Sequence, residues 1–208
     1  MGLIPGLLVV LLTLGPHSAQ SSPPSADELV AELGQFRAAL PAVARSDGTP
    51  DPTEERRRAI YDRLWTLGPV AMPALNRGLA DPDVQIRRNV ALFLNVAGDT
   101  WYEPSRPRLD IRPCLKALTA SLSDTDDRVR ALAAQALGAI GPEASSAVPA
   151  LVALLSSPDE GSRNSALIGL TKIGPAARDA LPAVRHALND PSADVRRFAQ
   201  RAIGAIEK

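Results

Sequence analysis

The sequence predicts an all-α protein of about five stacked helical hairpins, and three observations carry this prediction. Only 3% of the 208 residues are aromatic, so the core must consist mainly of Leu, Ile, Val and Ala, which suits closely packed helices. A repeat of 33 residues runs in phase over residues 109–208. Within each repeat, apolar residues recur at spacings of three, four and seven in two stripes. Each repeat therefore predicts a pair of amphipathic helices.

The N-terminal segment predicts an export signal over residues 1–19. Residues 3–14 form an uncharged apolar run that is too short to cross a bilayer comfortably, and Gly15-Pro16 ends it. Ala19 supplies a small residue for cleavage, so we expect the mature chain to begin near Gln20, with a linker over residues 20–26. The protein is then periplasmic or extracellular. The alternative is an uncleaved N-terminal segment that anchors the chain to a membrane.

The repeat domain is predicted to span residues 27–208. Its first two units, 27–68 and 69–98, lie upstream of an insertion at 99–108 that breaks the period. The first helix of the first unit is expected over residues 27–44. Three regular units follow at 109–141, 142–174 and 175–208.

Gly and Pro mark the ends of the predicted helices. Gly-Pro pairs begin at Gly68, Gly141 and Gly174, where one hairpin would end and the next begin. Pro73, Pro149 and Pro182 fall inside the first helices of their units. Because an interior Pro removes a backbone hydrogen bond, we expect these helices to bend or break.

Residues 124–142, which carry Arg130, Ala133, Leu137, Gly138 and the terminal Gly-Pro pair, resemble the short HEAT-like repeat of the phycobilisome-lyase type. The resemblance covers residues 27–208 and is strongest after residue 109. It implies a right-handed α-solenoid in which the second helices line a concave face. Such proteins typically use this surface to bind other proteins.

An Asp and an Arg six residues apart recur in most units. The pairs are Asp51/Arg57, Asp81/Arg87, Asp124/Arg130 and Asp190/Arg196, whereas Arg163 follows Ser157. The resemblance implies a structural ladder in which each Arg bonds the turn of its own and of the next unit. Because Arg163 lacks an Asp in its own turn, we expect Arg130→Ala to weaken the stack more than Arg163→Ala.

The composition predicts no catalytic, metal or cofactor site. The chain has 23 basic and 23 acidic residues, so nothing favours a nucleic-acid partner. His17 belongs to the predicted signal, which leaves His186 as the single mature His, and one His cannot form a metal cluster. Cys114 has no neighbouring base in the sequence and aligns with small residues of other units, so we expect it to be structural.

The helix phase divides core residues from surface residues. It places Leu137 at the centre of a core stripe and Gln135 on an exposed ridge. We therefore expect Leu137→Ala to be costly and Gln135→Ala to be nearly silent. On the same ridge we expect partner contacts from Arg58, Arg88, Leu92, Ile168, Arg197 and Arg201. Solvated arginines are the alternative.

The insertion carries two of the chain's few aromatic residues, Trp101 and Tyr102. They are predicted either to contact a partner or to cover the seam between two hairpins. Together these features predict a non-catalytic protein-protein interaction scaffold for an unidentified protein or peptide. The alternatives are a lyase-like or accessory enzyme of the HEAT-like repeat group, and a capping module that self-assembles end to end.

Overall fold

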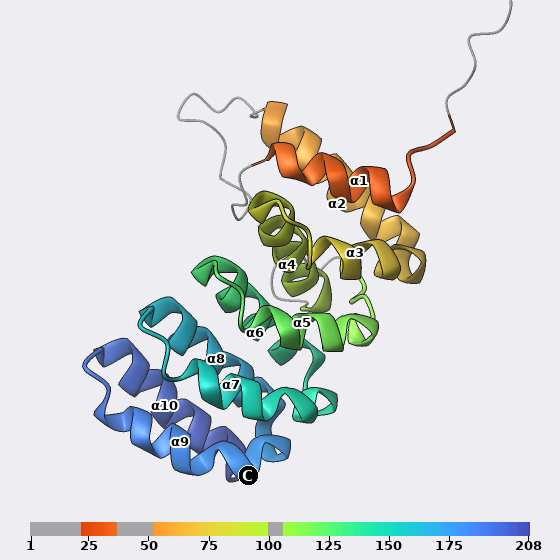
Figure 1. The fold of residues 1–208 in the computed structure, drawn as a ribbon. Helices are drawn as coiled ribbons and strands as arrows, with labels where there is room; N and C mark the ends of the chain where they lie inside the picture. Colours follow the sequence, from red (N-terminus) through yellow and green to blue (C-terminus); the bar gives the residue numbers. More distant parts are fainter. Residues whose placement is uncertain (1–21, 37–51, 100–105) are drawn as a thin grey trace, which may run out of the picture.

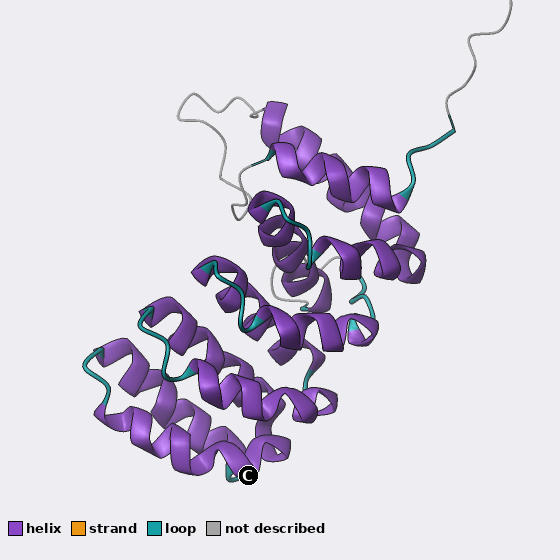
Figure 2. Ribbon diagram, in the orientation of Figure 1, coloured by secondary structure: helices purple, strands orange, loops and turns teal. Residues whose placement is uncertain are grey.

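A computed structural model describes residues 22–36, 52–99 and 106–208, and within them all the regular structure is helical (Figures 1 and 2). The α-helices are α1 (Ala26–Glu32), α2 (Pro52–Leu67), α3 (Met72–Gly78), α4 (Val84–Gly98), α5 (Leu115–Ser121), α6 (Asp127–Ile140), α7 (Val148–Leu154), α8 (Glu160–Ile173), α9 (Leu181–His186) and α10 (Ala193–Ile206). Short 3-10 helices stand at Leu33–Gln35, Gly68–Ala71, Arg112–Cys114, Pro142–Ala147, Gly174–Ala180 and Ala187–Asn189. The predicted fold class is confirmed.

The helices form a solenoid of antiparallel pairs. Helix α3 pairs with α4, α5 with α6, α7 with α8 and α9 with α10, and the pairs stack side by side (Figure 1). The second helices pack against one another in the order α4, α6, α8, α10. Each pair thus buries its apolar stripes mainly against its neighbours in the stack, as expected for a repeat protein.

The ends of the second helices follow from local sequence. Asp126 and Asp159 precede α6 and α8, and their carboxylates accept backbone N–H groups of the first turn, at 3.0 Å from Val129 and 2.6 Å from Ser162. Gly141 and Gly174 end the same helices with φ of 84° and 66°. Glycine adopts these values without strain, so the chain reverses there into the next pair.

The predicted breaks in the first helices are present. Pro73, Pro149 and Pro182 occupy the first turn of α3, α7 and α9, and a 3-10 segment precedes each of these helices. Proline is well tolerated there because the first N–H groups of a helix have no partner within the helix.

The first predicted helix is shorter than expected. Helix α1 and its 3-10 extension end at Gln35, and the backbone of Phe36 is extended. The buried amide of Asn89 donates to the carbonyl oxygens of Leu33 and Phe36 at 3.0 and 2.8 Å, so this turn is anchored on α4. The rest of the predicted segment, residues 37–44, lies outside the described residues.

Helices α6 and α8 approach most closely at glycine. A Cβ atom on Gly138 would lie 2.9 Å from the Cα of Gly169, and one on Gly169 would lie 2.7 Å from the carbonyl oxygen of Ala134. Such distances leave no room for a side chain, so these two glycines set the spacing of the central helices.

Several expectations fall outside the described residues. These are the signal over residues 1–19, Asp51 of the ladder, and Trp101 and Tyr102 of the insertion. Among the helices that the structure describes, none combines the length and apolar character that crossing a bilayer requires.

Candidate interaction surface

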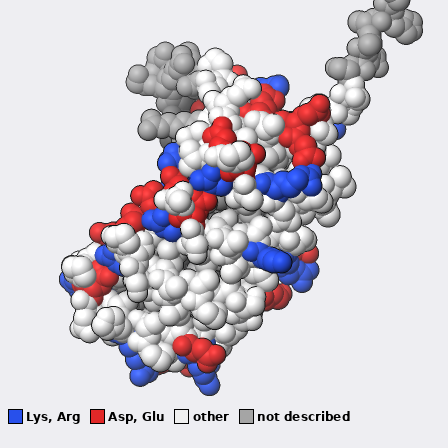
Figure 3. All heavy atoms as spheres, in the orientation of Figure 1, with Lys and Arg blue, Asp and Glu red and all other residues white. Residues whose placement is uncertain are grey.

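An ion-pair ladder runs along the rim formed by the turns between first and second helices. Arg87 of α4 donates from Nη1 to the carbonyl oxygen of Asp81 in its own turn, at 2.8 Å. Its Nε and Nη2 donate to both carboxylate oxygens of Asp124 in the following pair, at 2.8 and 3.0 Å. One guanidinium therefore joins two consecutive turns. Figure 3 shows acidic and basic side chains alternating along this rim.

Arg163 of α8 repeats this geometry. Its Nη1 bonds the carbonyl oxygen of Ser157 at 3.0 Å, and its Nε and Nη2 bond the carboxylate of Asp190 at 2.8 and 2.9 Å. Asp190 also accepts the backbone N–H of Ser192, which fixes the carboxylate in the turn. The hydrogen bond from Arg163 lowers the pKa of Asp190. The pair is mostly shielded from solvent, so it is screened less than a surface ion pair.

The ladder corrects our expectation about Arg130. The carboxylate of each bidentate pair comes from the following unit, and for Arg130 that position is Ser157. Arg130 keeps the bonds from Nη1 to the carbonyl oxygens of Asp124 and Thr125, at 2.9 and 3.2 Å. Within the described part of the chain its Nε and Nη2 have no hydrogen-bond partner. The geometry therefore predicts the opposite order for the two mutants.

Arg163→Ala is expected to destabilise the fold more than Arg130→Ala. The first change removes a two-bond charge-assisted contact, each bond of that type contributing about 1.5 to 3 kcal/mol before non-additivity, whereas the second removes only bonds to turn carbonyls. Urea denaturation of both variants measures the difference. An equal loss, or a larger loss for Arg130→Ala, would contradict the assignment of the carboxylate to the following unit.

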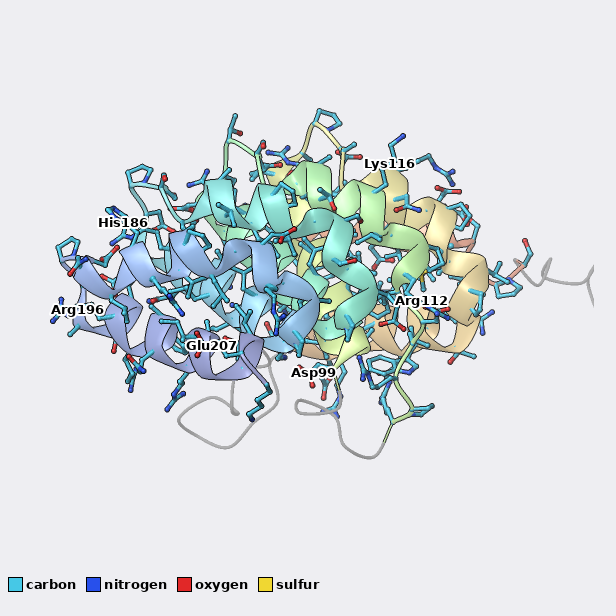
Figure 4. The ribbon with its side chains drawn as sticks, turned by 90° about the horizontal axis from the view of Figure 1, so that it is seen from below. Asp99, Arg112, Lys116, His186, Arg196 and Glu207 are labelled. Atoms are coloured by element: carbon cyan, nitrogen blue, oxygen red, sulfur yellow. The ribbon has the colours of Figure 1, made fainter. Side chains whose placement is uncertain are left out.

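The ladder changes at both ends of the described stack. Arg57 is buried, pairs with Glu54 of its own helix and lies 5.6 Å from the centre of the Tyr61 ring. Arg196 bonds the carbonyl oxygens of Asp190 and Pro191 at 2.7 and 2.9 Å. Figure 4 shows Arg196 at the α10 end of the solenoid.

Two of the expected contact residues are not available to a partner. Arg88 donates from Nε to Asp126 at 2.9 Å, and this bond is the main cause of the lowered pKa of Asp126. Leu92 is 1% exposed, so its predicted exposure is wrong. Helix α4 is covered on more than one side, because the segment after α1 packs on it and Tyr61 and Trp65 of α2 contact the ring of Phe93.

The open part of the predicted ridge lies on α8 and α10. Ile168 is half-buried, and Arg197 and Arg201 are exposed. Their guanidinium carbons lie 5.3 and 5.8 Å from the centre of the Phe198 ring, so the three residues form an Arg-Phe cluster on α10. The sequence pattern did not identify Phe198 as part of this surface. The sequence feature that could have identified it is an aromatic residue that directly follows Arg197 and stands three positions before Arg201.

The ridge is not continuous across the whole stack. Arg58 is exposed on α2, but the buried helix α4 separates it from the C-terminal positions. The continuous surface therefore consists of α6, α8 and α10. Beneath it, the Oδ1 atom of Asn164 is buried without a hydrogen-bond partner among the described residues.

Gln135 of α6 connects the second helices. It accepts from Nδ2 of Asn95 at 3.1 Å and donates from Nε2 to the hydroxyl of Ser165 at 3.0 Å. Asn95 and Ser165 are both buried. The expectation that Gln135 is only a surface residue is therefore wrong, because the phase of one helix does not show bonds to neighbouring helices.

The described end of the insertion packs against the solenoid. Arg106 pairs with Asp62 at 2.7 Å and lies 5.3 Å from the centre of the Trp65 ring. Trp65 donates from Nε1 to the carbonyl oxygen of Pro107 at 3.1 Å. Arg108 donates to the carbonyl oxygen of Gly98 at 2.6 Å and also to that of Ala139, which satisfies free acceptors at the ends of α4 and α6.

The opposite ends of the second helices are also tied together. Lys172 of α8 pairs with Asp99, which follows α4.

Asp99 and Glu207 lie along one edge of the molecule, whereas Lys116 and His186 lie along the other (Figure 4).

The described residues contain little reactive chemistry. Cys114 is buried 3.7 Å from the sulfur of Met72, and burial raises the pKa of its thiol to about 12. A thiol with this pKa is protonated at neutral pH and is a poor nucleophile. In residues 22–36, 52–99 and 106–208, no group of three or more His, Cys, Asp or Glu side chains could hold a metal ion.

The outward face of α10 is polar. Gln200 occupies the place at which α6 buries Ala134 and α8 buries Leu167, and it is exposed. A polar outer helix is typical of a capping repeat. This face therefore does not favour end-to-end self-assembly.

Comparison with known proteins supports the fold and the repeat type. Residues 115–207 match the family described as HEAT repeats. A comparison with curated protein sequences gives no match.

Solved structures of repeat proteins resemble the chain. The complex of CpcE and CpcF of phycocyanin lyase from Nostoc sp. PCC7120 contains a chain with 23% identity and a TM-score of 0.55, over 93% of this chain and 70% of that one. A computationally designed armadillo repeat protein for modular peptide recognition has 20% identity and a TM-score of 0.58, over 86% and 81%. A designed armadillo repeat protein in complex with the peptide (KR)4 has 17% identity and a TM-score of 0.56, over 87% and 81%.

Proposed function

We propose that the chain is a non-catalytic interaction scaffold that binds a peptide or protein segment across α6, α8 and α10. The observation that carries the proposal is the Arg-Phe cluster at the open end of this surface. Its two arginines are exposed, and the ring of Phe198 between them is only partly buried. Arginine and aromatic residues are the types most enriched at binding hot spots.

The charges of the cluster indicate an acidic and apolar partner. Arg197 bonds Asp194 at 2.8 Å, but both side chains are largely exposed, so water and a competing carboxylate can replace this contact. Arg201 has no ion pair among the described residues. A carboxylate can bind a guanidinium in two-bond geometry, while an apolar side chain packs on the ring.

The middle of the surface is held in place by hydrogen bonds between helices. Gln135 is held by Asn95 and Ser165, so this part of the surface is fixed before binding. The peptide-recognition and complex-forming roles stated for similar repeat proteins agree with this class of function.

Selection from a random peptide library, followed by fluorescence anisotropy, tests the proposal. Enriched peptides are expected to combine acidic and apolar residues, and Arg197→Ala/Arg201→Ala should weaken their binding at least tenfold. Arg178→Ala is the matched control, because Arg178 is exposed on the segment before α9. Failure to enrich any peptide, or equal affinities for the double mutant and the parent, would contradict the proposal.

We also propose that this scaffold is exported. The support is the uncharged apolar run over residues 3–14 and the small residue Ala19. Mass determination of the N-terminus from expressing cells is expected to show a chain beginning near Gln20. An N-terminus that still contains residues 3–14 would instead favour the anchored form.

A further inference from the structure

We infer that the gap in the ladder between α6 and α8 is a binding site for an acidic side chain of a partner peptide. The gap is defined by Arg130 and Ser157. The inference rests on the proposed scaffold function and specifies the chemistry of a second contact, on the rim of the same stack.

The geometry of Arg130 is that of an arginine prepared for a carboxylate. Its Nη1 bonds two turn carbonyls, as do the Nη1 atoms of Arg87 and Arg163. In those two residues, the same orientation directs Nε and Nη2 at an Asp of the following turn. For Arg130, the residue at this position is Ser157. Its side chain is too short to occupy the place that the Asp carboxylate takes in the other units.

A cavity lies beside Arg130 and Ser157. It has a volume of about 380 Å³ and is lined by Arg130, Ser156 and Ser157 together with apolar groups that include Leu122 and Ala153. One unit further along, a cavity of about 390 Å³ is lined by Asp190, whose carboxylate Arg163 holds. The two cavities are similar in size and lie at equivalent positions, and they differ in that Ser157 lines the first where Asp190 lines the second.

The neighbouring carboxylates have other hydrogen-bond partners, so none of them takes the place of the missing ladder carboxylate. The carboxylate of Asp124 is bound by Arg87, and that of Asp126 by Arg88. Asp159 lies close enough for Arg130 to help lower its pKa, but its carboxylate caps α8 through the N–H of Ser162. The hydroxyl groups of Ser156 and Ser157 add possible donors, and Leu122 and Ala153 provide an apolar wall for the methylene groups of Asp or Glu.

Ser157→Asp provides the sharpest test, because it supplies the missing carboxylate from the protein itself. The substitution should restore the ladder bond to Arg130, raise the melting temperature by a few degrees and close the site. Arg130→Gln should also remove binding, but without raising the melting temperature. Arg196→Gln is the control, because Arg196 bonds its own turn in the same way but lies on the last helix of the described stack.

The probe is the peptide acetyl-Ala-Asp-Ala-amide, with its Asn counterpart as the neutral control, titrated into protein labelled with ¹⁵N. The Nε–H resonance of Arg130 is expected to shift in a saturable way with the Asp peptide only, and the shift should vanish in Ser157→Asp. No saturable shift, an equal shift with the Asn peptide, or an equal shift at Arg196 would overturn the inference.

A second measurement separates this site from the proposed function. If library-selected peptides lose affinity in Arg197→Ala/Arg201→Ala but bind Ser157→Asp as tightly as the parent, the scaffold proposal stands and the gap is not part of its binding surface. If the Asp peptide occupies the gap but no selected peptide depends on the Arg-Phe cluster, the gap stands and the proposed surface on α10 is wrong.

Discussion

Gly169→Ala is expected to destabilise the protein, although the same change in an ordinary helix interior stabilises it by about 1 kcal/mol. The added Cβ atom would lie 2.7 Å from the carbonyl oxygen of Ala134, which is backbone and cannot move aside as a side chain can. Separating α6 from α8 disturbs the packing at the centre of the stack. Overpacking of this kind costs about 1 to 3 kcal/mol or more.

Gly204→Ala is the matched control for this prediction. Gly204 is also inside a second helix, but nothing lies within 4 Å of the position of its Cβ atom. The Gly204→Ala substitution should therefore stabilise the protein by up to about 1 kcal/mol. Urea denaturation of both variants is expected to give changes of opposite sign. A gain in stability for Gly169→Ala would show that α6 and α8 are not packed as closely as described.

Leu137→Ala is expected to lower the free energy of unfolding by about 2 to 5 kcal/mol. Leu137 has no exposed surface and lies in the middle of α6, where the helices of the neighbouring pairs prevent collapse around the cavity. Leu132→Ala in the same helix should cost clearly less, because Leu132 is only partly buried. Equal losses for the two variants would show that the core face of α6 is wrongly assigned.

Gln135→Ala is expected to cost about 1 to 3 kcal/mol rather than nothing, because it leaves the buried side chains of Asn95 and Ser165 without a hydrogen-bond partner. The same denaturation experiment measures this loss. An unchanged midpoint would mean that water replaces Gln135 at both positions.

The sequence was sufficient to predict the fold because the signals that determine it are local. Helix caps, Gly-Pro turns and apolar spacing all act within one repeat, and stacking then follows from the shared apolar stripes. The residues of the ladder could also be identified. Their pairing was not predicted correctly, because the six-residue spacing within a unit indicates the Asp of the same turn as the partner of each Arg.

A signal for the correct pairing was present in the spacing. Arg163 and its partner Asp190 are 27 residues apart, whereas Arg87 and its partner Asp124 are 37 apart. The difference equals the ten residues of the insertion at 99–108. Counting 27 residues from Arg130 leads to Ser157, which identifies the gap.

The surface could not be predicted in the same way. The burial of Leu92 depends on contacts made by segments far away in the sequence, including the turn after α1 and the aromatic side chains of α2. The periodicity of α4 shows which residues could face a neighbour, but not that neighbours cover the helix on several sides. The Arg-Phe cluster likewise became visible only when side-chain positions placed both guanidinium groups beside one ring.

Amide hydrogen exchange of the protein, with and without a library-selected peptide, tests the central claim most directly. If the chain is a scaffold that binds through its second helices, the peptide should slow exchange in α8 and α10, with smaller effects in α6, and leave the peptide chemically unchanged. Protection confined to the first helices α5, α7 and α9, or recovery of a chemically altered peptide, would contradict the account.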